Sequence, residues 1–137
     1  MQGSAGVVST VNDLLTYYDA GLTAWKHETR TNSKTTHSSL LEDVVSSLDE
    51  NIPLERSSNF HQYYGIGWAV SELPAPLGQI GINPMLVTEI PTVAKGVPER
   101  KTVWHHNRSF IGFLSSVHIL PDTDTAIVVL TSSLARQ

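Results

Sequence analysis

The 137-residue sequence contains no cysteine. Disulfide bonds, thiolate nucleophiles and cysteine-ligated zinc sites are therefore excluded, while the redox compartment stays undetermined. Basic residues are also few, with nine Lys and Arg against thirteen Asp and Glu and a net charge of -4. Because no basic stripe is available to neutralise phosphates, we expect no nucleic-acid partner.

Long apolar runs are missing as well. No segment approaches the roughly 20 apolar residues that cross a bilayer, so we expect no membrane span. The stretch from Met1 to Thr10 is small and polar and lacks the charged-then-apolar order of a signal peptide. A cytoplasmic location is therefore favoured. With 40% hydrophobic residues, a chain of this length is expected to form one domain with its own core.

Two helices are predicted in the first part of the chain. The first, at about 10–22, begins with Thr10 and Asp13 in a capping-box spacing. Its apolar residues follow helical spacing: Val11, Leu14, Leu15, Tyr18 and Leu22. Gly21 weakens its far end. The second helix is predicted at about 38–48, before a proline that ends it.

From about residue 63 onward the pattern changes to that of a sheet. Strands are predicted over four segments, 63–70, 102–106, 113–120 and 126–130, and the last two form a hairpin. Residues 74–100 hold five of the seven prolines and predict a long irregular excursion. The last segment, "AIVVL", has no polar side and predicts a central strand covered on both faces. The fold class is therefore α+β with an antiparallel sheet, part of whose covering layer the sequence does not provide.

Three segments resemble the serine β-lactamase and penicillin-binding-protein superfamily, in particular its class C-like esterase and lovastatin-acyltransferase-type branch. "GSAGVVSTVNDLLTYYDA" (3–20) resembles the Ala-Gly-x-x-Ser-Thr-x-x-Asp-Leu segment, and "YGIGWAV" (64–70) the Tyr-Gly-x-Gly-Trp strand. "HHNRSFIGFLSSVHILPDTDTAIVVLTSS" (105–133) resembles the His-x-Gly motif and the final hairpin. The resemblance implies a β-lactamase/transpeptidase-like fold and acyl transfer through a serine, without a cofactor.

The catalytic motifs of that family are absent. No Ser is followed by Lys three residues on, and no Tyr is followed by Asn or Ser two residues on. The nearest form, Ser133-Leu134-Ala135-Arg136, ends in an arginine that cannot act as a base. In the family both motifs precede the segment that matches Gly3–Gly6. We therefore interpret residues 1–137 as the C-terminal portion of one such domain, incomplete at both ends, without a catalytic nucleophile or base and inactive alone.

The resemblance places the substrate cleft along "HHNRSF". Aligning Gly112-Phe113 puts His106-Asn107-Arg108 on the family's His-x-Gly. His106 is then expected to face the substrate, and the N–H of Ser109 is expected to be an oxyanion-hole donor. Arg108 departs from the pattern because the family has glycine there. Its side chain should lie beside His106, where we expect it to crowd the cleft rather than to bind a substrate carboxylate.

Other interpretations of these residues are weaker. His105 and His106 should face opposite sides of a strand, so one metal ion cannot take both, and the remaining histidines show no zinc spacing. Asn107-Arg108-Ser109 matches a glycosylation sequon but lacks a secretion signal. We expect a parent enzyme that acts on a small-molecule ester, amide or thioester and passes the acyl group to water or an alcohol. The alternative is a non-catalytic interaction protein, or pseudoenzyme, whose uncovered sheet docks on a protein partner.

Overall fold

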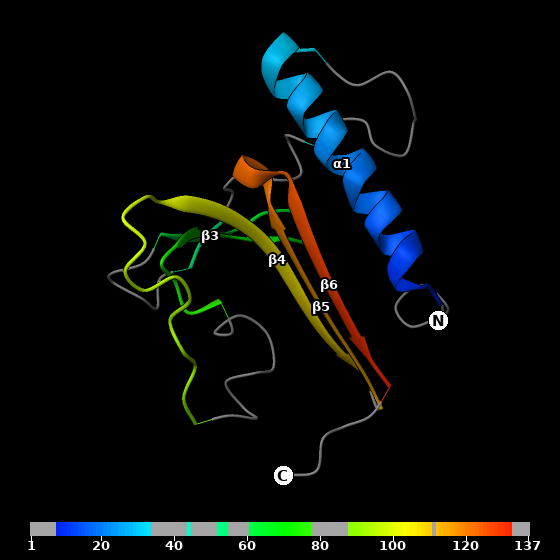
Figure 1. Cartoon of the computed structure of the whole chain (residues 1–137), viewed down its shortest axis with the longest axis vertical. Helices are drawn as coiled ribbons and strands as arrows, with labels where there is room; N and C mark the ends of the chain where they lie inside the picture. The colour runs from blue at the N-terminus through cyan, green and yellow to red at the C-terminus, as the bar shows by residue number, and fades with distance from the viewer. Residues whose placement is uncertain are drawn as a thin grey trace.

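The fold is one antiparallel sheet with a helix packed on it. The computed structural model describes residues 8–33, 44, 52–54, 61–77, 88–110 and 112–132. Within them, six strands follow one another in meander order, which confirms an α+β class (Figure 1). The elements are α1 (Val11–Thr31), β1 (Ile52–Pro53), β2 (Gln62–Tyr64), β3 (Ala69–Leu73), β4 (Lys101–Phe110), β5 (Phe113–Leu120), a short 3-10 turn (Pro121–Thr123) and β6 (Thr125–Thr131).

Helix α1 begins as predicted and runs nine residues longer than expected. The Thr10 hydroxyl accepts a hydrogen bond from the Asp13 N–H at 3.1 Å, and the Thr10 N–H donates to the Asp13 carboxylate at 3.3 Å. The helix ends at Asn32, whose left-handed backbone lets its N–H donate to the Glu28 carbonyl. Gly21 costs about 1 kcal/mol in a helix interior. Packing of Leu22 and Trp25 beyond it offsets that cost.

The second predicted helix, at about 38–48, lies almost wholly outside the described residues. Only Val44 is described, and it is helical and packs against the main core.

The predicted strand at 63–70 is wrong in its extent, because it is two strands joined by a tight turn. β2 ends at Tyr64 and β3 begins at Ala69. Between them the Gly65 N–H donates to the Trp68 carbonyl at 2.8 Å, and Gly67 has φ +82°, which favours glycine. The two glycines of "YGIGW" therefore make a hairpin turn rather than a flat strand.

The later strands follow the prediction closely. The strand at 113–120 is confirmed at both ends, the one at 102–106 extends to 101–110, and the one at 126–130 to 125–131. The last two form the predicted hairpin. In the 74–100 region the described residues are irregular, apart from a backbone bridge between Ala75 and Val93.

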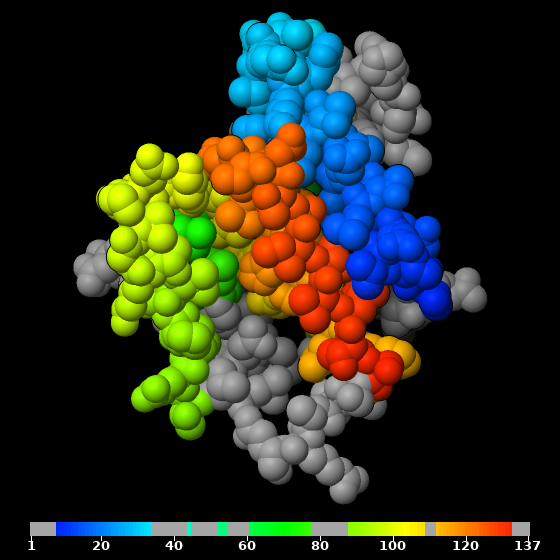
Figure 2. Space-filling model, viewed as in Figure 1, coloured from blue at the N-terminus to red at the C-terminus, as the bar shows by residue number. Residues whose placement is uncertain are grey.

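The prediction that "AIVVL" is a central, doubly covered strand is wrong for the described structure. β6 is the last strand in the sheet order, paired on one side with β5. Helix α1 packs on it from one face (Figure 1). Ile127, Val129 and Leu130 are nevertheless 48%, 53% and 38% exposed. Figure 2 shows this strand at the surface beside the helix. An uncharged apolar strand at an open edge is unusual, because natural edges are normally protected by charge or proline.

The strand register divides the sheet into two faces. The helix face carries a cross-strand row that packs with Leu22 of α1: Val70, Trp104, Ile119 and Ala126 on β3 to β6. Val117 and Val128 lie on the same face, paired with each other, and join this core. The opposite face carries Ser71, Val103, His105, His118 and Ile127. Trp25 and Trp104 meet edge-to-face at the centre of the helix face, with ring centroids 5.0 Å apart.

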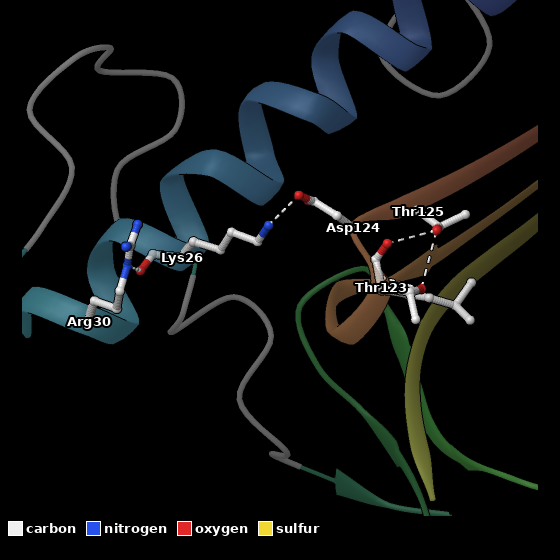
Figure 3. Close-up of polar contacts among 6 residues, drawn as sticks. Lys26, Arg30, Thr123, Asp124 and Thr125 are labelled. Atoms are coloured by element: carbon white, nitrogen blue, oxygen red, sulfur yellow. Dashed lines mark hydrogen bonds and ion pairs between the residues drawn. The ribbon is translucent and has the colours of Figure 1, made fainter. Parts of the chain in front are cut away.

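A polar contact anchors the far end of α1 to the sheet. Lys26 reaches Asp124, the left-handed residue before β6, with 2.5 Å between ammonium and carboxylate (Figure 3). Nearby, the Thr123 and Thr125 hydroxyls are hydrogen-bonded at 3.2 Å. Since both charged side chains are substantially exposed, the pair contributes at most about 1 kcal/mol and mainly orients the helix.

We expect Trp104→Ala to lower the free energy of unfolding by about 3–5 kcal/mol, because it empties the contact between α1 and the sheet. Urea denaturation followed by far-UV circular dichroism measures the loss. Tyr17→Ala, at a side chain that is 54% exposed, is the matched control with an expected change below about 1 kcal/mol. Equal losses for both variants would contradict the core assignment.

Candidate functional site

The three expected cleft residues lie together in the second half of β4. β3 pairs with β4 only as far as Ala69 opposite His105. From His106 to Phe110, β4 pairs with β5 on one side, and no described strand pairs with it on the other. Among the described residues this backbone edge is therefore unpaired, and it is the edge along which the resemblance expects a substrate chain to lie.

His106 and Arg108 lie on the helix face, as their spacing of two predicts. His106 is half-buried, and its ring contacts Trp68 edge-on with centroids 6.4 Å apart. Trp68 in turn contacts Tyr18 of α1 at 5.7 Å, and burial, with a smaller effect of Tyr17, raises the pKa of Tyr18. A line of aromatic rings therefore runs from α1 to His106 and fixes its position.

Arg108 is exposed, and its cross-strand partner is Ser115. The described residues show no carboxylate paired with its guanidinium. Ser109 lies opposite Leu114 in the ladder, which places its backbone in the open part of β4. These positions keep all three expected residues near one strand edge.

The opposite face of the sheet holds a polar cluster that the sequence analysis missed. The Gln62 amide donates to the Ser71 hydroxyl at 3.2 Å, and that hydroxyl lies 3.1 Å from Nε2 of His105. All three side chains are buried, with Ser71 0% and His105 1% exposed. Three neighbouring strands thus each contribute one member of a buried hydrogen-bonded row.

The row continues across β5. His118 lies directly opposite His105, and their rings are nearly parallel at 5.8 Å. Nε2 of His118 is 2.8 Å from the Ser116 hydroxyl, which donates to the Asn107 side chain at 2.6 Å. Alternation along β4 sends His105 to the face away from Trp104, opposite to that of His106.

The hydrogen bonds assign the proton position on each ring. Since the Ser116 hydroxyl gives its proton to Asn107, it accepts from His118, whose proton is therefore on Nε2. Because Gln62 donates to Ser71, the Ser71 hydroxyl can donate to Nε2 of His105, which leaves its proton on Nδ1. That Nδ1 is buried and has no partner. Burial, together with the nearby His118 and His106, lowers the pKa of His105 to about 4, and burial lowers the pKa of His118. Both rings are therefore neutral at pH 7.

Ser71 and His105 bring a hydroxyl next to an imidazole nitrogen, as a serine nucleophile and its base do, but they lack the solvent access and the orienting carboxylate of a catalytic pair. A serine nucleophile must reach its substrate, whereas these two side chains are 0% and 1% exposed. In a catalytic triad the second ring nitrogen is oriented by a carboxylate, whereas Nδ1 of His105 has no partner. The pair is therefore structural in this arrangement.

The described residues were also compared with the requirements of a metal site and of a membrane span. Within them, no three His, Asp or Glu side chains gather closely enough to hold a metal ion. No helix in that part of the chain has the length and apolar character to cross a bilayer.

Comparisons with protein-family models, curated proteins and solved structures gave no match. The β-lactamase resemblance consequently depends on the motifs and on where the fold places them.

We expect Ser71→Ala to destabilise the protein by about 1–3 kcal/mol, because Gln62 and His105 each lose a buried partner. Thermal and urea unfolding at pH 7 measure the change. Ser115→Ala, a serine on the helix face of β5, is the control and should change the stability by less than about 1 kcal/mol. A negligible effect of Ser71→Ala would mean that the buried row contributes nothing to stability.

Proposed function

We propose that this chain forms the C-terminal wall of a β-lactamase-like serine hydrolase or acyltransferase. The open edge of β4 at 106–110 carries the proposal, because it presents His106 and the Ser109 backbone where the resemblance expects substrate. The other two motifs agree with this placement. Thr10 and Asp13 of the first motif cap α1, and "YGIGW" forms the hairpin that brings Trp68 against His106.

In the proposed reaction a serine outside this sequence attacks the acyl carbon of an ester, amide or thioester. The leaving alcohol, amine or thiol departs with a proton, and water or an alcohol then takes the acyl group from the serine. The role of this chain is electrostatic and positional. The Ser109 N–H donates to the developing oxyanion, and such a donor contributes about 3–4 kcal/mol in a complete site.

Arg108 modifies that site. Its guanidinium projects from the helix face beside His106, at a position where the family has glycine. We propose that it narrows the approach to the strand edge and so disfavours the usual catalysis, even in a completed fold.

The isolated chain is expected to be inactive. Purified protein should not hydrolyse nitrocefin or a chromogenic ester and should not react with a fluorophosphonate probe, because the Ser-x-x-Lys motif is absent and neither Ser–His contact among the described residues suits a nucleophile. The Ser71–His105 pair is inaccessible, and the Ser116 hydroxyl donates its proton to Asn107 rather than to His118. A serine hydrolase treated in parallel is the positive control. The proposal also expects in-frame Ser-x-x-Lys and Tyr-x-Asn sequences upstream of Met1 in the encoding transcript. Fluorophosphonate labelling of the wild-type chain that is lost in Ser71→Ala would overturn the proposal.

A second candidate function is a binding module that adds a strand to its sheet. The exposed, uncharged β6 favours it, because an open edge of this kind is a template for an extended segment of a protein partner.

We expect a charge on this edge to suppress association. Light scattering after size exclusion should show concentration-dependent association of the wild-type chain and a monomer for Val129→Lys, since lysine protects edge strands. Thr16→Lys, on the exposed surface of α1, is the matched control and should behave as wild type. A monodisperse wild-type monomer with a cooperative melt would argue against the binding module.

A further inference from the structure

The outer edge of β6 has no partner among the described strands. Its backbone pairs with β5 on one side only, and apolar side chains are exposed on both faces of the sheet: Leu130 on the helix face, and Ile127 and Val129 on the opposite face. The strand carries no charged residue and no proline. Because charge and proline are the usual means of keeping an edge strand from pairing, β6 is suited to receive another strand.

The apolar stripe of α1 also extends past the described sheet. Val11 and Leu15 continue the helical spacing of the residues that pack in the core, which are Tyr18, Leu22 and Trp25. Val11 and Leu15 are nevertheless exposed. Because α1 packs on β6, the outermost strand, one more strand beside β6 would widen the apolar surface that this stripe faces (Figure 1).

The sequence of β6 is nearly a palindrome in chemical type. On either side of Val128 its residues match in pairs: Ile127 with Val129, Ala126 with Leu130, and Thr125 with Thr131. The central pairs are β-branched, the next pair is apolar, and the outer pair carries hydroxyls. Side chains of these kinds stabilise antiparallel strands when they lie directly opposite each other. An antiparallel copy of β6 centred on Val128 is therefore chemically complementary to β6 itself.

A two-fold axis perpendicular to the sheet generates this pairing. Such an axis keeps each side chain on its own face, and residues directly opposite each other in an antiparallel pair share a face. The axis must therefore pass beside a residue and not between two residues, which the register centred on Val128 satisfies. Since alternate pairs of opposite residues exchange two backbone hydrogen bonds, two seven-residue strands gain about six to eight.

The charges at the ends of β6 are compatible with this register. Asp124, just before the strand, is paired with Lys26, and it would lie opposite the uncharged Ser132 of the second copy. No like charges therefore meet between residues 124 and 132, although the chain has a net charge of -4. A register centred on Ile127 would instead set Leu130 against Asp124 and lose the match of residue types.

The other end of the described sheet does not offer a second edge of this kind. It is β1, which has two residues and ends in Pro53, a residue without the N–H that strand pairing requires. Both chains therefore use the same surface, as in other two-fold dimers, and the assembly closes at two copies.

We propose that β6 pairs with β6 of a second copy of this chain, antiparallel and centred on Val128, and so joins two sheets into one. The inference rests on the second candidate function, the binding module, and names its partner. Helix α1 and its copy then lie on the same face of the joined sheet, because the axis preserves the faces.

Engineered cysteines test the register, because the natural sequence contains none. Ile127 should lie opposite Val129 of the second copy, with Cα atoms about 4.5–5.5 Å apart, a distance that a disulfide spans. Ile127→Cys and Val129→Cys chains, mixed in equal amounts before mild oxidation, should therefore form a disulfide-linked heterodimer. Either variant alone sets its thiols on diagonal positions, roughly 7–8 Å apart, and should give little linked product. Non-reducing electrophoresis and mass spectrometry of the linked peptides measure both.

Both positions are exposed, so the variants should fold, and far-UV circular dichroism checks this. Thr16→Cys, on the exposed surface of α1, is the control for random collision and should not crosslink. Light scattering of the wild-type chain should approach twice the mass of one chain as the concentration rises.

The outcomes separate this inference from the binding module. A chain that associates without forming the mixed disulfide, or that crosslinks equally at Ile127→Cys alone or Thr16→Cys, would overturn the β6 dimer and leave the module standing. Assemblies larger than two chains would also overturn the closed dimer. A wild-type chain that stays monomeric at every concentration would count against the dimer and the module together.

Discussion

The register between β4 and β5 determines most of this structure. Phe110 opposite Phe113 leaves a two-residue turn that contains Gly112 at φ +82°, a conformation that glycine adopts without strain. That turn places His105 opposite His118 and Trp104 opposite Ile119. A slip of one residue would exchange the faces, turning His106 away from Trp68 and Trp104 away from α1. The core and the polar row therefore depend on one turn.

Local sequence patterns predicted where the helix and the strands lie better than they predicted which side chains meet across neighbouring strands. The Thr10–Asp13 cap, the 113–120 strand and the final hairpin could be found because caps, alternation and turn residues act over a few positions. The buried row could not be found by type and spacing along the chain, because His105 and His118 meet only through pairing. The signal was present in Gly112, and a two-residue loop at that position gives the register directly.

β6 shows where a local pattern is misleading. "TAIVVLT" has the composition of a strand covered on both faces, yet its outer edge and Ile127 and Val129 are exposed. The apolar composition of β6 suits a strand that is covered on both faces, whereas the exposed fractions show that the described residues do not cover it. The mismatch is a physical reason to expect another strand at this edge. The second candidate function supplies one, as an extended segment of a protein partner.

His105 and His106 are adjacent in sequence but have opposite chemical roles, because a strand alternates its faces. His106 is half-buried beside Trp68 and lies where β4 has no partner among the described strands, the edge at which we propose that substrate binds. His105 is buried in a hydrogen-bonded row in which its lowered pKa keeps the ring neutral. Substitution of His105 should therefore change the stability of the fold, whereas substitution of His106 should change the proposed substrate contact. A binding defect in His106→Gln with an unchanged free energy of unfolding would locate recognition on the helix face.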